Sequence, residues 1–434
     1  MRNWLYFSLF TFHFSLLLWL VADSLLLMLV CLPEISAYPL DAYEATQLRR
    51  LDAARRVQEG TLEGNKLPKG ALLSSTAVEL RLLDHGELDL PPVDAAFTRD
   101  VIKLLGDNAD RYSLAILDLS DREHPRYAEH RAQELYNPGS VGKLMVAMGL
   151  MQLLADRYPN DTDARWRVLR DTRIAADDFI ISDHHPVRLW DPQTGIFEHR
   201  QLQIGDQGNL FDFLDWMVSA SANAAASIII REAMLLKQYG TAYPVAAVEA
   251  RRYFKETPKT ELSRILGAVL QDPVTRNGMD SQSLRQGSFF TAAGNRYVPG
   301  SRSYASARAL LRYLLRMEQG RIVDPFSSVQ IKRLMYSTER RIRYASAPAL
   351  NNAAVYFKSG SLYQCAPEPD FVCRKYHGNV KNLMNSVAIV ESPAGQARLY
   401  YLVALMSDVL RKNSAVDHQT LATEIHKLIE NLHK

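Results

Sequence analysis

The 434-residue sequence contains only three cysteines and carries little net charge, because 51 lysines and arginines nearly balance 48 aspartates and glutamates. It has no dense basic stretch, no basic segment interleaved with aromatic residues and no zinc-finger spacing, so a nucleic-acid partner is not expected. Internal repeats and low-complexity blocks are absent as well. A content of 47% hydrophobic and 23% charged residues is typical of a folded soluble protein.

Long hydrophobic runs are confined to the N-terminus. About thirty mostly apolar residues follow Arg2, in NWLYFSLFTFHFSLLLWLVADSLLLMLVCLP, and ISA ends at Ala37 as a small-residue cleavage site would. We therefore predict that residues 1–37 are a signal peptide or a membrane anchor, and the sequence favours neither. Lipid attachment at Cys31 is disfavoured because Val30 precedes it. Under both interpretations the protein is exported, to the periplasm or to the outer face of the inner membrane.

The two cysteines outside this run are Cys365 and Cys373, at the ends of the proline-containing stretch CAPEPDFVC. In an oxidising compartment such a pair predicts a disulfide that closes a small loop. Metal binding is the alternative, but two cysteines without a second pair supply too few ligands. We expect neither a metal nor a cofactor.

Hydrophobic periodicity divides the rest of the chain into an arm, residues 38–96, and a folded domain, residues 97–434. In the arm we expect a short helix followed by irregular chain. At the start of the domain, FTRDVIKLLG predicts a helix and YSLAILDLSD a buried strand. Near the C-terminus, β-rich runs at 353–361, 386–392 and 399–407 precede an amphipathic helix at 420–432.

Helices are predicted between the early and late strands, at 140–158, 210–236, 259–270 and 306–320. The second of them has a break of small residues in its middle. Residues 160–206 and 271–303 are polar or rich in Gly, Ser and Asn, and we expect loops there. One early and three late strands imply a single antiparallel sheet built from both chain ends, with a helical region inserted between them. This is an α+β fold.

The stretch YNPGSVGK places Ser140 three residues before Lys143, at the start of a long apolar helix. Residues one helical turn apart share a face and can touch. Burial of that face would strip the lysine of solvation and make it available as a base for the serine. Two more polar sets follow along the chain: Ser221 and Asn223 within SASANAAAS, and Lys358, Ser359 and Gly360 within YFKSGS.

The order S-x-x-K, S-x-N, K-S-G resembles the active-site set of the penicillin-recognising serine enzymes, and the class A β-lactamase domain in particular. The flanking sequences NPGSVGKLMVAMGL and SASANAAASIII are similar to that family's surroundings too. The resemblance runs from Phe97 to the C-terminus and leaves the arm outside. It implies a β-lactamase/DD-peptidase-like fold and catalysis through an acyl-enzyme.

The resemblance implies four catalytic residues. Ser140 would attack a carbonyl carbon, and Lys143, briefly neutral, would take its proton. Ser221 would relay that proton to the leaving nitrogen, and Lys358 would supply positive charge at the edge of the site.

The resemblance also implies a set of substrate-binding groups. Asn223 would hydrogen-bond a substrate amide. The backbone N–H groups of Ser140 and Ser361 would form the oxyanion hole. Ser359 would meet the substrate carboxylate, and Gly360 would let the strand approach closely.

The sequence departs from the class A pattern in two places. No E-x-x-L-N pattern, which carries the water-activating glutamate, occurs between the second and third motifs, and Ala222 stands where aspartate is usual. Glu256 and Glu261 fall at a plausible separation, although Glu261 lies in ELSRIL, an ordinary helical pattern. Without such a base the acyl-enzyme would be released slowly, as in penicillin-binding peptidases.

Two loops raise further questions. ISDHHPVRLW offers Asp183, His184 and His185 as a zinc site, but adjacent histidines usually diverge and no H-E-x-x-H spacing is present, so we expect a solvated loop. The cysteine loop follows the third motif, and a lid or specificity element and a simple staple are equally compatible with it. Beside it, Arg374 and Lys375 would attract an anionic substrate.

Two hypotheses follow. The first is an exported serine hydrolase that forms an acyl-enzyme on Ser140 with a β-lactam or a D-alanyl peptide of peptidoglycan. The second is a catalytically silent envelope protein that uses the same cleft, or the arm, to bind peptidoglycan or a partner. The retention of every polar group in the three motifs favours the first hypothesis.

Overall fold

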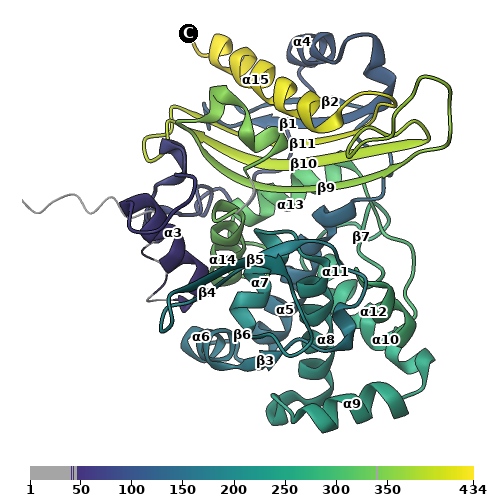
Figure 1. The fold of residues 1–434 in the computed structure, drawn as a ribbon. Coiled ribbons are helices and arrows are strands. Elements are labelled where there is room, and N and C mark those ends of the chain that lie inside the picture. Colours follow the sequence, from purple (N-terminus) through teal and green to yellow (C-terminus); the bar gives the residue numbers. More distant parts are fainter. Residues whose placement is uncertain (1–40, 42, 44–45, 339–340) are drawn as a thin grey trace, which may run out of the picture. The chain divides into compact units, whose positions relative to one another are not determined.

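The computed structural model describes residues 41, 43, 46–338 and 341–434 (Figure 1). The described residues all belong to one compact unit. The predicted signal peptide or membrane anchor at 1–37 lies outside the described residues and stays a prediction. Among the residues that are described, no helix has both the length and the apolar character needed to cross a membrane.

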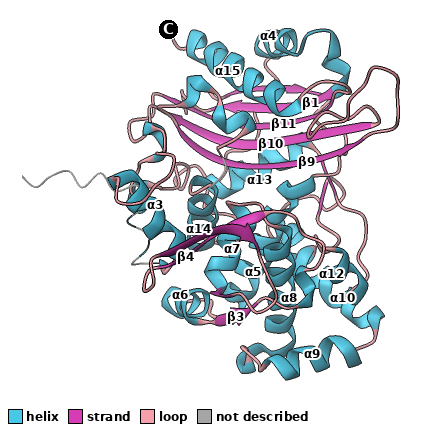
Figure 2. Ribbon diagram, viewed as in Figure 1, coloured by secondary structure: helices cyan, strands magenta, loops and turns pink. Residues whose placement is uncertain are grey.

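Five antiparallel strands form the main sheet, in the order β2-β1-β11-β10-β9 (Figure 2). Their bounds are β1 Tyr112–Asp118, β2 Arg126–His130, β9 Ala354–Gln364, β10 Lys381–Ser392 and β11 Leu399–Asp408. The early and late strands meet where β1 pairs with β11, from Tyr112 opposite Ser407 to Asp118 opposite Tyr401. The predicted α+β fold, with one sheet built from both chain ends, is confirmed.

The expectation of a single early strand was wrong, because β2 is a second one. Its sequence is RYAEH, and only Tyr127 and Ala128 are buried. β2 lies at the edge of the sheet beside β1, and on its outer side Tyr127 forms only an isolated bridge with Val93. Edge strands tolerate charged residues, so this short polar segment carries no hydrophobic period that sequence analysis could detect.

Both faces of the sheet are covered, which explains why its central strands read as continuous apolar runs. Alternate residues of β1 point to opposite sides. Leu114 and Ile116 join the core under α4 (Ala95–Leu105) and α15 (Ser414–Leu432). Ala115 and Leu117 join the core of the helical region, with α13 (Ala307–Glu318) next to the sheet (Figure 1).

The helical region is centred on α5 (Lys143–Arg157), in which residues 143–154 are all buried. A helix that is apolar on nearly every side belongs in the interior, as the sequence predicted. The predicted helix at 210–236 is split at its small-residue break into two helices. The helices around α5 are α7 Leu210–Val218, α8 Asn223–Tyr239, α10 Lys259–Leu270 and α14 Pro325–Tyr336, with α9 Ala247–Glu256 beyond them.

The two segments expected to be loops contain short elements. Within 160–206 lie α6 Thr162–Asp171, β3 Arg173–Ala175 and the hairpin of β4 Pro186–Asp191 with β5 Ile196–Gln201, and β6 Gln207–Asn209 follows. Within 271–303 lie α11 Asp272–Arg276, β7 Leu284–Arg285 and α12 Ala292–Tyr297, and β8 Tyr304–Ala305 pairs with β7. Elements this short span too few turns or alternations for periodicity to reveal them.

The arm begins with α3 (Arg49–Glu59) and continues as irregular chain, as predicted. It is packed onto the rest of the unit, since Leu51, Val78 and Leu82 belong to the large hydrophobic core. The arm is therefore a structural part of the fold, although it lies outside the motif-bearing segment.

A buried ion pair joins the arm to α7. The guanidinium of Arg50 bonds the carboxylate of Asp215, with side-chain exposures of 5% and 1%, and donates to the Ser337 carbonyl at 2.7 Å. We expect Arg50→Ala to lower the free energy of unfolding by about 3–5 kcal/mol, because it leaves a buried carboxylate without its partner. Urea denaturation measures this loss. The exposed Arg111, paired with Asp110, is the matched control, and Arg111→Ala should cost about 1 kcal/mol or less.

Candidate active site

Ser140 lies in a tight turn, Gly139–Gly142, immediately before α5 begins at Lys143. The helix therefore starts slightly later than the sequence predicted. Gly139 has a φ of +52°, a left-handed conformation that favours glycine. The turn leaves Ser140 half-buried at the helix start, while Lys143 is completely buried one turn below it.

The ammonium of Lys143 connects the first two motifs. Its Nζ donates to Ser140 Oγ at 2.8 Å, to the Ser221 carbonyl at 2.7 Å and to Asn223 Oδ1 at 2.7 Å. The ring of Phe290 lies 4.8 Å from the same nitrogen. A lysine has three protons to donate, and these three acceptors match them. The predicted contact between the serine and the lysine is thus present in the structure.

Ser221 sits between α7 and α8 with a φ of +64°, which is uncommon for a residue with a side chain. Its hydroxyl accepts a hydrogen bond from Lys358 Nζ at 2.8 Å. Lys358 is 2% exposed and comes from β9. The strained turn places the Ser221 hydroxyl at Lys358 and its carbonyl at Lys143, so it brings the second motif into contact with both of the others.

The third motif lies in β9 against the turn that carries Ser140. A Cβ atom at Gly360 would stand 2.4 Å from the Pro138 carbonyl oxygen and 2.6 Å from the Ser140 nitrogen. Only glycine permits this approach. A Cβ at Gly139 would lie 3.3 Å from the Ser361 nitrogen. The backbone nitrogens of Ser140 and Ser361 therefore both lie where β9 contacts this turn.

Arg343 is a site residue that sequence analysis missed. Its guanidinium donates to Ser359 Oγ at 2.8 Å and to Ser361 Oγ at 3.1 Å, and it stacks on the Tyr376 ring at 4.6 Å. It has a φ of +58° in an irregular segment after α14. No short motif surrounds it, so only the tertiary structure shows that it belongs with the third motif.

These residues line one cleft with a volume of about 760 Å³. The basic residues at its wall are Arg343, Lys358 and Lys375, and His184 and His185 line it as well. Among the described residues that form the wall, none is an aspartate or a glutamate. The cleft therefore suits an anionic ligand.

Neither glutamate considered from the sequence lies at this wall. Glu261 is on α10 and pairs with Arg264 on the protein surface, and Glu256 ends α9. The interpretation of either as a water-activating base is not supported. The segment beside Lys143 instead presents Gln286 and the ring of Phe290.

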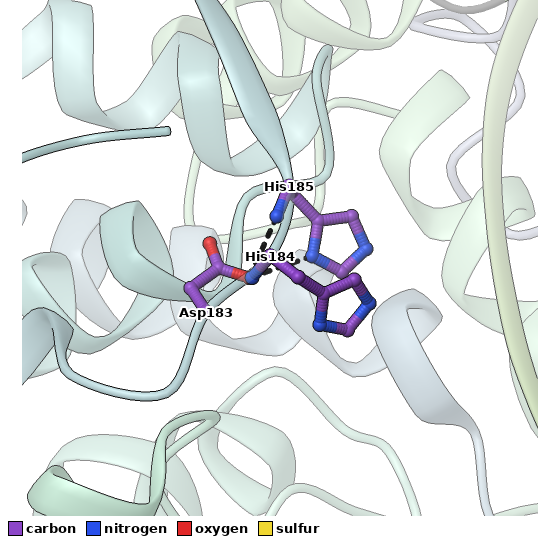
Figure 3. Close-up of side chains that lie close together, drawn as sticks. All are labelled: Asp183, His184 and His185. Carbon is purple, nitrogen blue, oxygen red and sulfur yellow. Dashed lines mark hydrogen bonds and ion pairs between the residues drawn. The ribbon is translucent and has the colours of Figure 1, made fainter. Parts of the chain in front are cut away.

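Asp183, His184 and His185 lie in a loop and His184 is exposed, as expected, but the Asp183 side chain is buried and not solvated. The Asp183 side chain is 5% exposed, and both histidines line the cleft. The two imidazole rings were expected to diverge, but they stack with their centroids 4.5 Å apart (Figure 3). Asp183 Oδ2 accepts a bond of 2.8 Å from the Ala224 N–H at the start of α8, which fixes this loop against the second motif.

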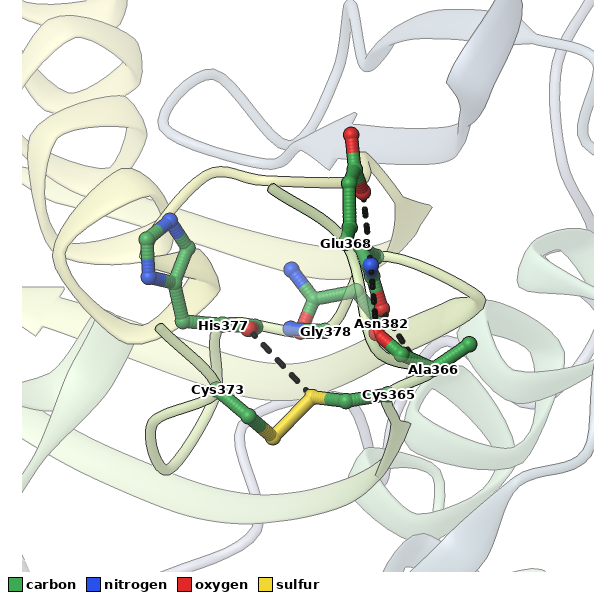
Figure 4. The surroundings of a disulfide bond; sticks show 8 residues. Cys365, Ala366, Glu368, Cys373, His377, Gly378 and Asn382 are labelled. Atoms are coloured by element: carbon green, nitrogen blue, oxygen red, sulfur yellow. Dashed lines mark hydrogen bonds between the residues drawn. A yellow bond between two sulfur atoms is a disulfide. The ribbon is translucent and has the colours of Figure 1, made fainter. Parts of the chain in front are cut away.

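The predicted disulfide between Cys365 and Cys373 is present (Figure 4). The chain that follows it brings Lys375 and Tyr376 to the cleft wall, whereas Arg374 is exposed and does not line the cleft. Burial would raise the pKa of Tyr376, but the positive charges of Arg343 and Lys375 outweigh it and lower that pKa below 10.0. The residues that reach the cleft follow the disulfide-closed loop, and no residue from Cys365 to Cys373 is among those described at the cleft wall.

The fold and this cleft define a β-lactamase-like protein of the kind that includes the penicillin-binding serine hydrolases. The sequence over residues 96–429 matches the beta-lactamase enzyme family, and the chain belongs to that family.

Solved structures with the same fold are distant in sequence. PBP-A, in a mutant form as an acyl-enzyme complex with penicillin G, is 13% identical with a TM-score of 0.51, over 79% of this chain and 100% of that one. The TLA-3 extended-spectrum β-lactamase is 13% identical with a TM-score of 0.50, over 78% of this chain and 99% of that one. No protein of curated function matches the sequence.

Proposed function

We propose that this protein is an exported serine hydrolase that forms an acyl-enzyme on Ser140 with a β-lactam or with a peptide that ends in D-alanine. The observation that carries the proposal is the 2.8 Å contact between Lys143 Nζ and Ser140 Oγ inside a basic cleft. Both kinds of substrate offer an amide carbonyl close to a carboxylate, and the cleft has groups suited to each.

Acylation begins when Lys143, in its neutral form, takes the proton of Ser140. Burial of Lys143 favours that form, because a charged amine loses solvation there. The Ser140 oxygen attacks the carbonyl carbon, and the N–H groups of Ser140 and Ser361 stabilise the oxyanion. The C–N bond then breaks, and Ser221, held by Lys358, gives its proton to the leaving nitrogen. The proton that Lys143 took from Ser140 restores the Ser221 hydroxyl.

The substrate carboxylate binds where Ser359, Arg343 and Lys358 gather. Arg343 donates a hydrogen bond to the Ser359 hydroxyl, so a carboxylate that accepts a hydrogen bond from that hydroxyl lies beside the guanidinium. Charge-assisted hydrogen bonds of this kind are stronger than neutral ones. Asn223 reaches the substrate amide from the start of α8.

Labelling with a fluorescent penicillin tests this function. We expect the wild-type protein to be labelled and Ser140→Ala to remain unlabelled, because the label is an ester of the Ser140 oxygen. Excess D-alanyl-D-alanine peptide should slow the labelling. Equal labelling of both proteins would contradict the proposal. No labelling of either, together with tight binding of a muropeptide, would favour the silent envelope protein instead.

A charge change at the cleft wall should affect substrate capture. We expect Lys375→Ala to lower the second-order rate of acylation by an anionic penicillin by about fivefold at low salt, which corresponds to about 1 kcal/mol for one exposed charge. Stopped-flow measurement of acylation gives this rate. Arg374→Ala is the control, because it removes the same charge from the adjacent exposed position outside the cleft. If this variant lost as much of its acylation rate as Lys375→Ala, the role of Lys375 at the cleft wall would be refuted.

A further inference from the structure

We propose that Asp183 and His185 form a catalytic dyad in which His185 Nε2 is the general base that activates water to release the acyl group from Ser140. The inference rests on the proposed function, since it concerns the second half of the same reaction. Two observations motivate the inference. The described cleft wall contains no carboxylate that could activate water, and it contains two histidines.

Asp183 is held as a carboxylate that can only accept hydrogen bonds. Oδ1 accepts from the His184 N–H at 2.8 Å, from the His185 N–H at 3.2 Å and from His185 Nδ1 at 2.7 Å (Figure 3). Oδ2 accepts from the Ala224 N–H at 2.8 Å. Burial would raise the pKa of Asp183, but the bonds from His185 and Ala224 lower it to about 2. Asp183 is therefore ionised at any physiological pH.

This arrangement determines the tautomer of His185. A carboxylate has no proton to give, so His185 Nδ1 carries the proton of the 2.7 Å bond. In the neutral ring, Nε2 then holds a free lone pair. Among the described residues, no group hydrogen-bonds to Nε2, and the ring borders the same cleft as Ser140. The pairing of an oriented imidazole with a buried carboxylate is that of a general base in serine hydrolases.

The electrostatic surroundings keep this base neutral. Burial lowers the pKa of His185 below its ordinary 6.5, and the positive charge of Lys143 acts in the same direction, against the bond from Asp183. The titratable groups around the ring are Asp183 and His184 in its own loop and Lys143 on α5. At neutral pH most molecules therefore have His185 ready to accept a proton.

The step conserves atoms and charge. His185 Nε2 takes a proton from water as the water oxygen bonds to the acyl carbon of the Ser140 ester. The tetrahedral intermediate collapses, the bond from carbon to Ser140 Oγ breaks, and that oxygen takes the proton back from the imidazolium. The products are the free carboxylic acid, the Ser140 hydroxyl and neutral His185. No oxidant, metal or second substrate takes part.

The test uses residues 38–434, which include the arm. The protein is exposed briefly to benzylpenicillin, and the acyl-enzyme is then followed by intact-mass spectrometry. We expect His185→Ala to form the adduct at the wild-type rate and to lose it about 10²–10⁴-fold more slowly, the usual contribution of a general base. His124→Ala is the matched control, because it removes an exposed imidazole that pairs with Asp121 and is not among the residues described at the cleft wall. The control should release the adduct at the wild-type rate.

The pH dependence separates a catalytic from a structural role. Because the base must be neutral, adduct release in the wild type should slow as pH falls through the pKa of His185, below 6.5. His185→Ala should lose this dependence. Equal adduct lifetimes in the wild type and His185→Ala would overturn the dyad and leave the proposed function intact. A wild-type protein that forms no adduct would overturn both, and equally slow release in His124→Ala would overturn the assignment of the effect to His185.

Discussion

We expect Lys143→Met to reduce the rate of Ser140 acylation by about a thousandfold. The ammonium contacts Ser140, Ser221 and Asn223 at 2.7–2.8 Å and is the only described basic nitrogen with a hydrogen bond to the Ser140 hydroxyl. A positioned base typically contributes about 10²–10⁴-fold to such a step. Stopped-flow measurement of adduct formation with a chromogenic β-lactam gives the rate directly.

Methionine is chosen because it has a similar length and no charge. The substitution removes the donor from three acceptors, so we expect a lower melting temperature, and acylation is measured well below it. Lys103→Met, on the exposed side of α4, is the control and should acylate normally. A fully active Lys143→Met would show that the Ser140 proton leaves by another route.

The second large effect is expected from a single added methyl group. In Gly360→Ala, the new carbon would stand 2.4 Å from the Pro138 carbonyl oxygen and 2.6 Å from the Ser140 nitrogen. Both contacts are with backbone, so β9 and the Ser140 turn must move apart. We expect acylation to fall at least about 10²-fold, since losing one oxyanion donor alone has an effect of that size.

Gly267 provides the matched control. It lies in α10, and a Cβ there would meet no atom within 4 Å. Gly267→Ala should leave acylation unchanged and raise stability by about 0.4–1 kcal/mol, because alanine restricts the unfolded chain and favours the helix. If Gly360→Ala acylated as fast as Gly267→Ala, the close contact between β9 and the turn would not be needed for catalysis.

The sequence predicted the parts of this molecule that depend on local pattern. The apolar helix behind Ser140 and the late strands carry strong periodicity over many residues, and the motif residues lie at fixed spacings within them. The break at Ser221 was visible as a run of small residues. The contact of Lys143 with the second motif follows once α5 and α8 pack together.

The features that sequence analysis missed depend on long-range contacts. Arg343 joins Ser359 only because the segment after α14 passes β9. Asp183 accepts a hydrogen bond from the start of α8, 41 residues further along the chain, and the sequence around Asp183 does not indicate this partner. The histidines were expected to diverge, and the carboxylate that binds one of them holds the loop so that the rings stack instead.

The most direct test of the central claim is to locate the acyl group. A protein of residues 38–434 is treated with benzylpenicillin and quenched in acid, and its peptides are sequenced by mass spectrometry. We predict that the added mass resides on Ser140, in the peptide containing YNPGSVGK, and is absent from Ser140→Ala. An adduct on any other residue, or none in the wild-type protein, would contradict the assignment of Ser140 as the nucleophile.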